Sequence, residues 1–140
     1  MGSTTPTVAE YVIQRLAELG IDRVFCVPGD YTFPFDDAIE VSNSVQWVVC
    51  ANELNAAYAA DGYARINGVA MLTITYGVGK LSAINGVMGA KAQRLPVFHL
   101  VDAPSTRIQK QGLITHHTLG MAFITTFANF PRRLVVYQRR

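Results

Sequence analysis

Charge is scarce in this sequence of 140 residues: 16% of the residues are charged, and the formal net charge is +2. Few charges beside 50% hydrophobic residues exclude an extensively disordered chain and provide enough apolar surface for one compact core. The basic residues form no internal stripe, which argues against a nucleic-acid-binding surface. No apolar run reaches the roughly 18 residues of a membrane span, and no basic-then-apolar leader opens the chain. We therefore expect a cytoplasmic domain with neither a membrane nor nucleic acid as its partner.

Cysteine is also rare. Cys26 and Cys50 both lie in apolar runs, where two thiols make no disulfide framework, so we predict that both are reduced core residues. No group of Cys, His and carboxylates has the spacing of a zinc site, and we expect no metal ligand in this chain. A P-loop is missing, and Gly77-Val78-Gly79 is too short to count as a dinucleotide fingerprint.

Two hydrophobic periods alternate along the chain, and together they predict an α/β fold. Short apolar runs predict four buried strands, near residues 23–27, 46–50, 69–75 and 96–101. Helical spacing and turn signals predict helices between them, at residues 33–39, 53–66 and 81–92. Because the strand runs are apolar without alternation, they are typical of a parallel sheet flanked by helices on both faces.

A further helix is predicted before the first strand. Thr7 and Glu10 have the spacing of a capping box, in which each side chain binds the other residue's backbone N–H. Gly20 is a natural end for this helix. Its apolar face is predicted to comprise Val8, Tyr11, Val12, Leu16 and Leu19.

Polar residues follow the predicted strands, where parallel α/β sheets usually bind their ligands. Glu53 stands at a helix start, either as a charge that favours the helix dipole or as a buried carboxylate that protonates a ligand. Asp30 is open to the same choice, since Asp is also a common turn residue. His116 and His117 point in different directions, so one can face a site, with a surface or packing role as the alternative. We expect Glu53 and Asp30 at the same edge of the sheet.

Four motifs carry a more specific indication. They are Val27-Pro28-Gly29-Asp30-Tyr31, the run from Asn52 to Arg65, Thr75-Tyr76-Gly77-Val78-Gly79 and His116-His117-Thr118-Leu119-Gly120. In combination they resemble the amino-terminal, pyrimidine-binding domain of thiamine-diphosphate-dependent 2-oxo acid decarboxylases. That family includes pyruvate, indolepyruvate and phenylpyruvate decarboxylases, which convert a 2-oxo acid to an aldehyde and carbon dioxide.

The resemblance implies a role for each candidate residue. Glu53 matches the glutamate that hydrogen-bonds a pyrimidine ring nitrogen of thiamine diphosphate and favours the imino tautomer of that ring. Asp30, His116 and His117 match the polar residues that handle protons around the reaction intermediates. The walls of the pyrimidine pocket correspond to Val27, Pro28, Gly29 and Thr75.

The resemblance also implies that this chain carries half a site. In the family, the diphosphate and Mg²⁺ are held by a separate, later domain, and the active assembly is a homodimer or tetramer. We therefore expect the isolated chain to be inactive. A carboligase of the acetolactate synthase type is one alternative, although the paired histidines and Gly29-Asp30-Tyr31 argue against it. A non-catalytic α/β interaction module is another. Lys80 and Asp102 depart from the family pattern, and neither is given a function.

The resemblance ends near Gly120, so we expect an incomplete pyrimidine-binding domain over residues 1–120 and an aberrant tail over residues 121–140. Shifting the reading frame by one base after Gly120 permits Asp-Gly followed by Val, Tyr, His, Asn and Phe, which is the expected family continuation. We predict that a frameshift separates Gly120 from Met121, and that the tail does not complete the sheet.

Overall fold

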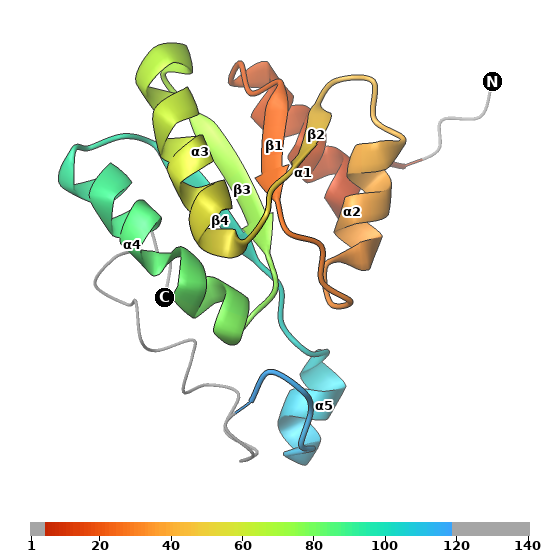
Figure 1. Cartoon of the computed structure of the whole chain (residues 1–140). Helices are drawn as coiled ribbons and strands as arrows, with labels where there is room; N and C mark the ends of the chain where they lie inside the picture. The colour runs from red at the N-terminus through yellow and green to blue at the C-terminus, as the bar shows by residue number, and fades with distance from the viewer. Residues whose placement is uncertain (1–4, 119–140) are drawn as a thin grey trace.

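The computed structural model describes residues 5–118, which form a four-stranded sheet with helices on both faces (Figure 1). In chain order the elements are α1 Val8–Glu18, β1 Arg23–Cys26, α2 Phe33–Glu40, β2 Gln46–Val49, α3 Glu53–Asn67, β3 Ala70–Ile74, α4 Val78–Ala92, β4 Val97–Val101 and α5 Thr106–Gln111. The predicted α/β fold and the four predicted strands are confirmed, and each strand end lies within one residue of its predicted place.

All four strands run parallel, in the order β2-β1-β3-β4. β3 is buried along its whole length, whereas the edge strand β2 has no fully buried residue. Because the strands are parallel and β1 lies between β2 and β3, the loops that follow these three strands meet at the carboxyl-terminal end of the sheet. We call this end the sheet edge. This edge is where the candidate residues lie.

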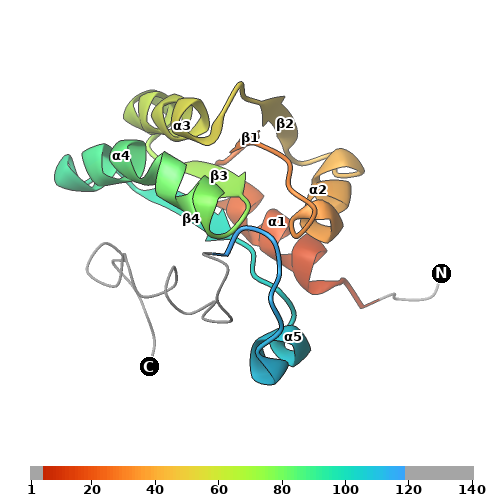
Figure 2. The same ribbon diagram turned by 60° about the horizontal axis from the view of Figure 1, so that its bottom comes forward.

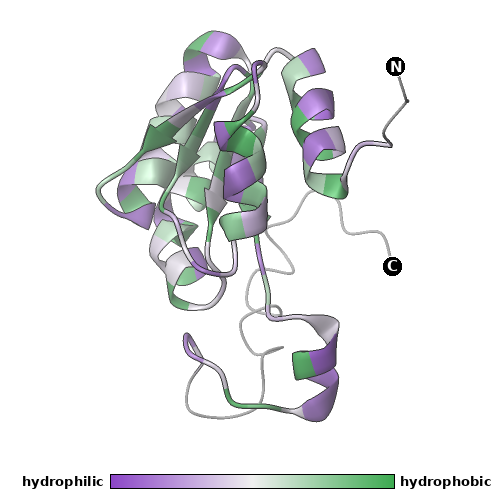
Figure 3. Ribbon diagram, turned by 90° about the vertical axis from the view of Figure 1, so that its right-hand side faces the viewer, coloured by the Kyte–Doolittle hydropathy of each residue, from purple (hydrophilic) through white to green (hydrophobic). Residues whose placement is uncertain are grey.

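Two helices cover each face of the sheet (Figures 1 and 2). Leu72 and Ile74 of β3 pack in the core beneath α3 and α4, whereas Met71 packs with Ile13 and Leu16 beneath α1 and α2. α5 lies apart, past the ends to which the strands point, and buries no residue (Figure 1). Figure 3 shows hydrophilic turns on the flanking helices and on α5. The strand pattern therefore follows the two-sided burial that the sequence predicted.

Small residues let α3 and α4 approach closely. A Cβ placed on Gly86 of α4 would lie 2.6 Å from the Cβ of Ala57 and 2.9 Å from the Ala57 carbonyl carbon. Only a glycine fits against the α3 backbone at that point, so the narrow, Ala-rich face of α3 has a direct structural use.

Two details of the predicted helices are wrong. The buried residues of α1 are Ile13 and Leu16, while Val8, Tyr11 and Leu19 have exposed fractions of 82%, 54% and 57%. The buried stripe is therefore rotated about the helix axis toward Ile13, because α1 contacts the sheet and α2 on that side. α4 also begins earlier than predicted, at Val78.

Both cysteines are free thiols, as predicted. Cys26 is buried and Cys50 is half-buried. The Cys50 backbone N–H donates to the Cys26 carbonyl oxygen (2.9 Å) at the end of the β1–β2 pairing. Burial is the main cause that raises the pKa of both thiols, which keeps them protonated.

The predicted break between Gly120 and Met121, and the predicted failure of the tail to complete the sheet, lie outside the described residues. Within residues 5–118, none of the helices has the length and apolar character needed to cross a membrane.

Candidate functional site

Three candidate residues come from the ends of three adjacent strands. Asp30 follows β1, Glu53 opens α3 directly after β2, and Thr75 follows β3. Asn52 caps α3, accepting from the Asn55 N–H (2.9 Å), and this fixes where the helix begins. Asp30 and Glu53 therefore lie at the same edge of the sheet, as expected.

Glycines bring Thr75 and Glu53 into contact with the neighbouring loops. A Cβ on Gly29 would lie 2.7 Å from the Thr75 Cβ, and a Cβ on Gly79 would lie 2.9 Å from the Thr75 Cγ2. The same Gly79 position is 3.4 Å from the Glu53 Oε1. The backbone at Gly29 and Gly79 therefore packs against the side chains of Thr75 and Glu53. We call these four residues the cradle.

The cradle holds a polar atom without a partner. The Thr75 side chain is buried, and among the described residues its Oγ1 has no hydrogen-bond partner. Buried hydroxyls are normally paired, so an unpaired one is an exception that needs an explanation. The Thr75 Oγ1 lies on the Gly29 side of the cradle, whereas its Cγ2 lies on the side of Gly79 and Glu53. Val27, also predicted for this pocket, is half-buried at the end of β1, whereas Pro28 is exposed.

A second group forms where residues 113–118 return to the sheet edge. The His116 Nε2 lies 2.9 Å from the Asp30 Oδ1 and 2.8 Å from the Asp30 Oδ2. This hydrogen bond is the main cause that lowers the pKa of Asp30, and the charges of His116 and His117 act in the same direction. Asp30 and His116 are each about 50% exposed, so the pair faces solvent in this chain.

Aromatic rings support this pair. The Tyr31 ring stacks on the His116 ring, with centroids 4.7 Å apart and planes 18° apart. The Tyr31 hydroxyl also lies 3.3 Å from the His116 Nδ1. The His117 ring packs edge-on to His116, with centroids 4.6 Å apart. Candidate atoms of Asp30, His116 and His117 all lie within 4.8 Å of one another.

Asp30, His116 and His117 are close enough to share a metal ion, although the sequence predicted no metal ligand. One carboxylate and two imidazoles are a donor set that can hold a divalent metal. Sequence spacing did not reveal the group, because Asp30 and the histidines are far apart along the chain. The Asp30 carboxylate is already engaged by His116, and such a charge-assisted pair needs no ion to satisfy it.

The two groups meet at residues 75–79. Gly77 has a φ of 69°, in the left-handed region, and a Cβ there would lie 2.3 Å from the His117 carbonyl oxygen. Sequence reasoning noticed Gly77-Val78-Gly79 but gave these glycines no role. Their spacing after a buried strand was the available signal. Tyr76, between Thr75 and Gly77, was also given no role from the sequence.

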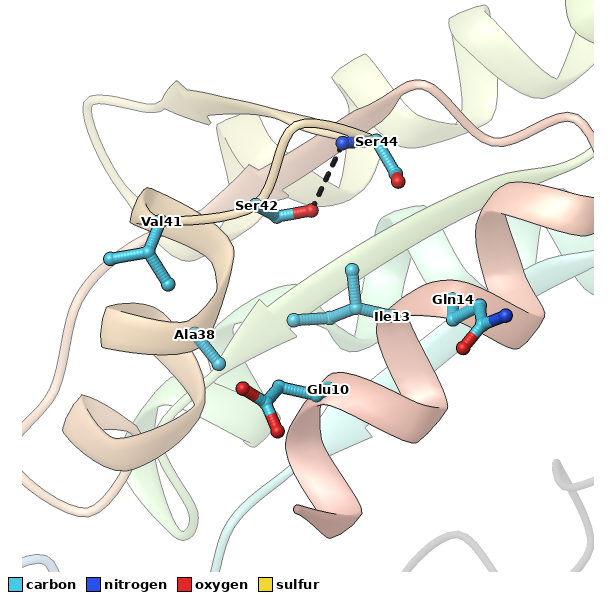
Figure 4. Close-up of a pocket in the computed structure, with 7 residues that line it drawn as sticks. All are labelled: Glu10, Ile13, Gln14, Ala38, Val41, Ser42 and Ser44. Atoms are coloured by element: carbon cyan, nitrogen blue, oxygen red, sulfur yellow. Dashed lines mark hydrogen bonds between the residues drawn. The ribbon is translucent and has the colours of Figure 1, made fainter. Parts of the chain in front are cut away.

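A pocket lies elsewhere, between α1 and α2 (Figure 4). It is lined by Glu10, Ile13, Gln14, Ala38, Val41, Ser42 and Ser44 and has a volume of about 330 Å³. It shares no residue with the sheet edge. Its one carboxylate, Glu10, already accepts from the Thr7 N–H (2.7 Å) in the capping box, so the pocket offers no reactive group.

Comparison with known proteins identifies the family to which the chain belongs. The family described as thiamine pyrophosphate enzyme, N-terminal TPP binding domain, matches residues 6–123. An alpha-keto-acid decarboxylase of Mycobacterium leprae is 50% identical over 114 residues, covering 81% of this chain and 20% of that protein. A pyruvate decarboxylase of Aspergillus fumigatus is 50% identical over 121 residues, covering 86% and 21%.

An alpha-keto-acid decarboxylase of Mycobacterium avium is 46% identical over 132 residues, covering 94% of this chain and 23% of that protein. The chain therefore spans less than a quarter of the length of these relatives. The matched residues include both groups at the sheet edge. The chain belongs to the thiamine pyrophosphate enzyme family, of which it is an N-terminal TPP binding domain.

Proposed function

We propose that this chain provides the pyrimidine-binding half of a non-oxidative 2-oxo acid decarboxylase that uses thiamine diphosphate and Mg²⁺. One observation carries the proposal: the cradle and the Asp30–His116 pair lie at the same sheet edge, joined through residues 75–79. A carboxylate and an unpaired hydroxyl within one cradle suit a flat nitrogen ring, and an acid–base pair at the same edge suits proton transfer. The named relatives, all decarboxylases, favour this reaction over carboligation.

The residues of the cradle fit the cofactor's pyrimidine. Gly29 and Gly79 let their loops pack closely on Thr75, where a Cβ would clash. The Thr75 Oγ1 has no partner among the described residues, so a ring substituent would be its partner. Glu53 Oε1 would share a proton with a ring nitrogen and so favour the imino tautomer of the pyrimidine. When bound, thiamine diphosphate supplies the electron sink that lets a 2-oxo acid lose carbon dioxide.

Asp30, His116 and His117 would act on protons at the substrate side. Asp30 holds the proton on the His116 Nε2, since its two oxygens both lie within 3 Å of that nitrogen. A histidine so paired can donate to a carbon or oxygen that becomes basic after carbon dioxide leaves. His117 packs against the same ring and adds a second imidazole to the group.

Half of the binding site would come from elsewhere. Asp30 and His116 are half exposed here, although desolvated sites strengthen such interactions. We propose that a diphosphate- and Mg²⁺-binding domain of another subunit covers this edge, in a homodimer or tetramer. The isolated chain would then neither hold the cofactor nor release carbon dioxide.

Replacing the corresponding segment of the Aspergillus fumigatus relative by residues 5–118 tests the proposal. The hybrid should release carbon dioxide from pyruvate. Glu53→Gln in the hybrid should lower kcat by about 100-fold or more, because it removes an acid–base group, without changing the circular dichroism spectrum. Glu40→Gln, an exposed position on α2, is the matched control and should retain turnover. Near-normal turnover of the Glu53→Gln hybrid would remove Glu53 from the mechanism.

A further inference from the structure

Tyr76 contacts three residues of the segment 113–118, which we call the returning segment: Thr115, His116 and His117. Its side chain is buried at the end of β3, and its hydroxyl lies 2.5 Å from the His116 carbonyl oxygen. The Thr115 Oγ1 lies 2.9 Å away on the other side. A phenol has one proton, which goes to the carbonyl, so Thr115 donates to the Tyr76 oxygen. One hydroxyl therefore binds two consecutive residues of the returning segment.

The returning segment needs such a hold because its own conformation is costly. His117 has a φ of 62°, in the left-handed region that side chains other than glycine seldom adopt. Within the segment, the Thr118 Oγ1 donates to the Thr115 carbonyl oxygen (2.7 Å), and this is a local turn contact only. Residues held in this region persist when surrounding contacts determine them. Tyr76, directly after β3, provides such contacts through its hydrogen bonds to Thr115 and His116.

Tyr76 also supports His116 from a second direction. Its ring packs edge-on to Tyr31, with centroids 5.0 Å apart, and Tyr31 in turn stacks on the His116 ring. It packs edge-on to His117 as well, with centroids 6.2 Å apart. Both the backbone and the ring of His116 are thus fixed through Tyr76, directly or through one neighbour.

We propose that Tyr76 is a positioning residue, whose hydroxyl ties residues 115 and 116 to the end of β3 and so holds His116 against Asp30. It is not a catalytic residue, because its oxygen is occupied by Thr115 and His116. Its relevance to turnover rests on the proposed decarboxylase function. Its effect on the Asp30–His116 pair does not.

The carboxyl resonance of Asp30, titrated by NMR in the full chain, is the direct test. Asp30 faces His116 and His117 from the returning segment, and Tyr31 and Tyr76 are the other titratable groups nearby. In the wild type its pKa should lie below the ordinary value of about 3.9. Tyr76→Phe, which keeps the ring and removes the hydroxyl, should return that pKa to the ordinary value. Tyr58→Phe, half exposed on α3, is the matched control and should leave Asp30 unchanged.

Two further variants keep the outcome decisive. His116→Gln should also return the Asp30 pKa to its ordinary value, which shows that the measurement reports the pair. If Tyr76→Phe does not fold, Thr115→Val removes the donor to Tyr76 while keeping the bond to the His116 carbonyl, and should raise the Asp30 pKa partway. A folded Tyr76→Phe chain in which Asp30 keeps its lowered pKa would overturn the proposal.

Turnover of the hybrid enzyme separates this inference from the proposed function. Tyr76→Phe should lower kcat about 10-fold and shift the pH profile, with less effect on KM, since a misplaced acid–base group weakens proton transfer. An unchanged profile beside an inactive Glu53→Gln hybrid would refute the role of Tyr76 and leave the proposed function intact. Full activity of the Glu53→Gln hybrid would refute the proposed function, while the Asp30 titration still decides whether Tyr76 positions the pair.

Discussion

Thr75 shows how a single side chain can be poorly suited to the isolated chain and well suited to a ligand. Its hydroxyl is buried between the Gly29 and Gly79 loops without a partner among the described residues. Leaving such a group unpaired costs about 1–3 kcal/mol of folding stability. Thr32, also fully buried, differs because its Oγ1 accepts from the Gly29 N–H (3.0 Å) and lies 2.5 Å from the Asp36 Oδ2.

The same substitution should therefore have opposite effects at these two threonines. Thr75→Val removes an unpaired hydroxyl at nearly constant volume and should raise the free energy of unfolding by about 1 kcal/mol. Thr32→Val strands the Gly29 N–H and should lower it by about 1–3 kcal/mol. Urea titrations of the two variants and the wild type measure both changes. A destabilised Thr75→Val chain would mean that its hydroxyl is satisfied in solution.

At the scale of elements, two of the glycines in helix α4, Gly86 and Gly89, have different surroundings. Gly86 faces the α3 backbone at Ala57, whereas a Cβ on Gly89 would meet no atom within 4 Å. Helix propensity favours alanine over glycine at both positions, by about 0.5–1 kcal/mol. Of these two positions, steric overlap opposes alanine only at Gly86, where the nearest atoms are the Ala57 Cβ and the α3 backbone around it.

Gly86→Ala should lower the free energy of unfolding by about 1–3 kcal/mol, because α3 and α4 must separate to admit the methyl group. Gly89→Ala should raise it by about 0.5–1 kcal/mol through helix propensity alone. Chemical denaturation of the two variants, made in the same helix, provides the comparison. Equal effects at both positions would contradict the close packing of α3 and α4.

Elements were easier to predict from the sequence than contacts between them. Apolar runs such as that of β3 specify a two-sided strand locally, so strand ends could be placed to within one residue. The buried face of α1 could not, since its apolar positions surround most of the helix and only packing on α2 selects Ile13. The position of Tyr76 under the histidines depends on a chain return across 40 residues, which no local pattern encodes.

For the whole molecule, two half-buried titratable residues, His99 in β4 and Asp102 directly after it, respond to pH in opposite directions. Burial, aided by the charge of Asp36, raises the pKa of Asp102 to about 7. Burial, aided by the charge of Lys80, lowers the pKa of His99 to about 4. Asp102 Oδ2 and His99 Nε2 are both buried without a hydrogen-bond partner among the described residues. Neither of these two atoms therefore has a hydrogen bond to stabilise a charge on it.

The signs of the two contributions follow from proton uptake. Between the unfolded Asp pKa of about 3.9 and pH 7, the folded chain holds a proton on Asp102 that the unfolded chain has lost, so stability falls as pH rises. Between pH 4 and the unfolded His pKa of about 6.5, the unfolded chain holds a proton that folded His99 lacks, so stability rises with pH. From about pH 4 to 6.5 the two slopes oppose each other.

Replacing either Asp102 or His99 should therefore reveal the pH dependence of stability that the other residue causes. Relative to the wild type, Asp102→Asn should gain stability progressively as pH rises from about 4 to 7, by about 1 kcal/mol per pH unit, because the cost of ionising Asp102 is gone. His99→Gln should gain stability as pH falls from 6.5 to 4, by a similar amount. Denaturation at several pH values measures both differences, with Asp37→Asn, exposed on α2, as the control. Differences that stay constant with pH would show that these side chains ionise alike in the folded and unfolded chain.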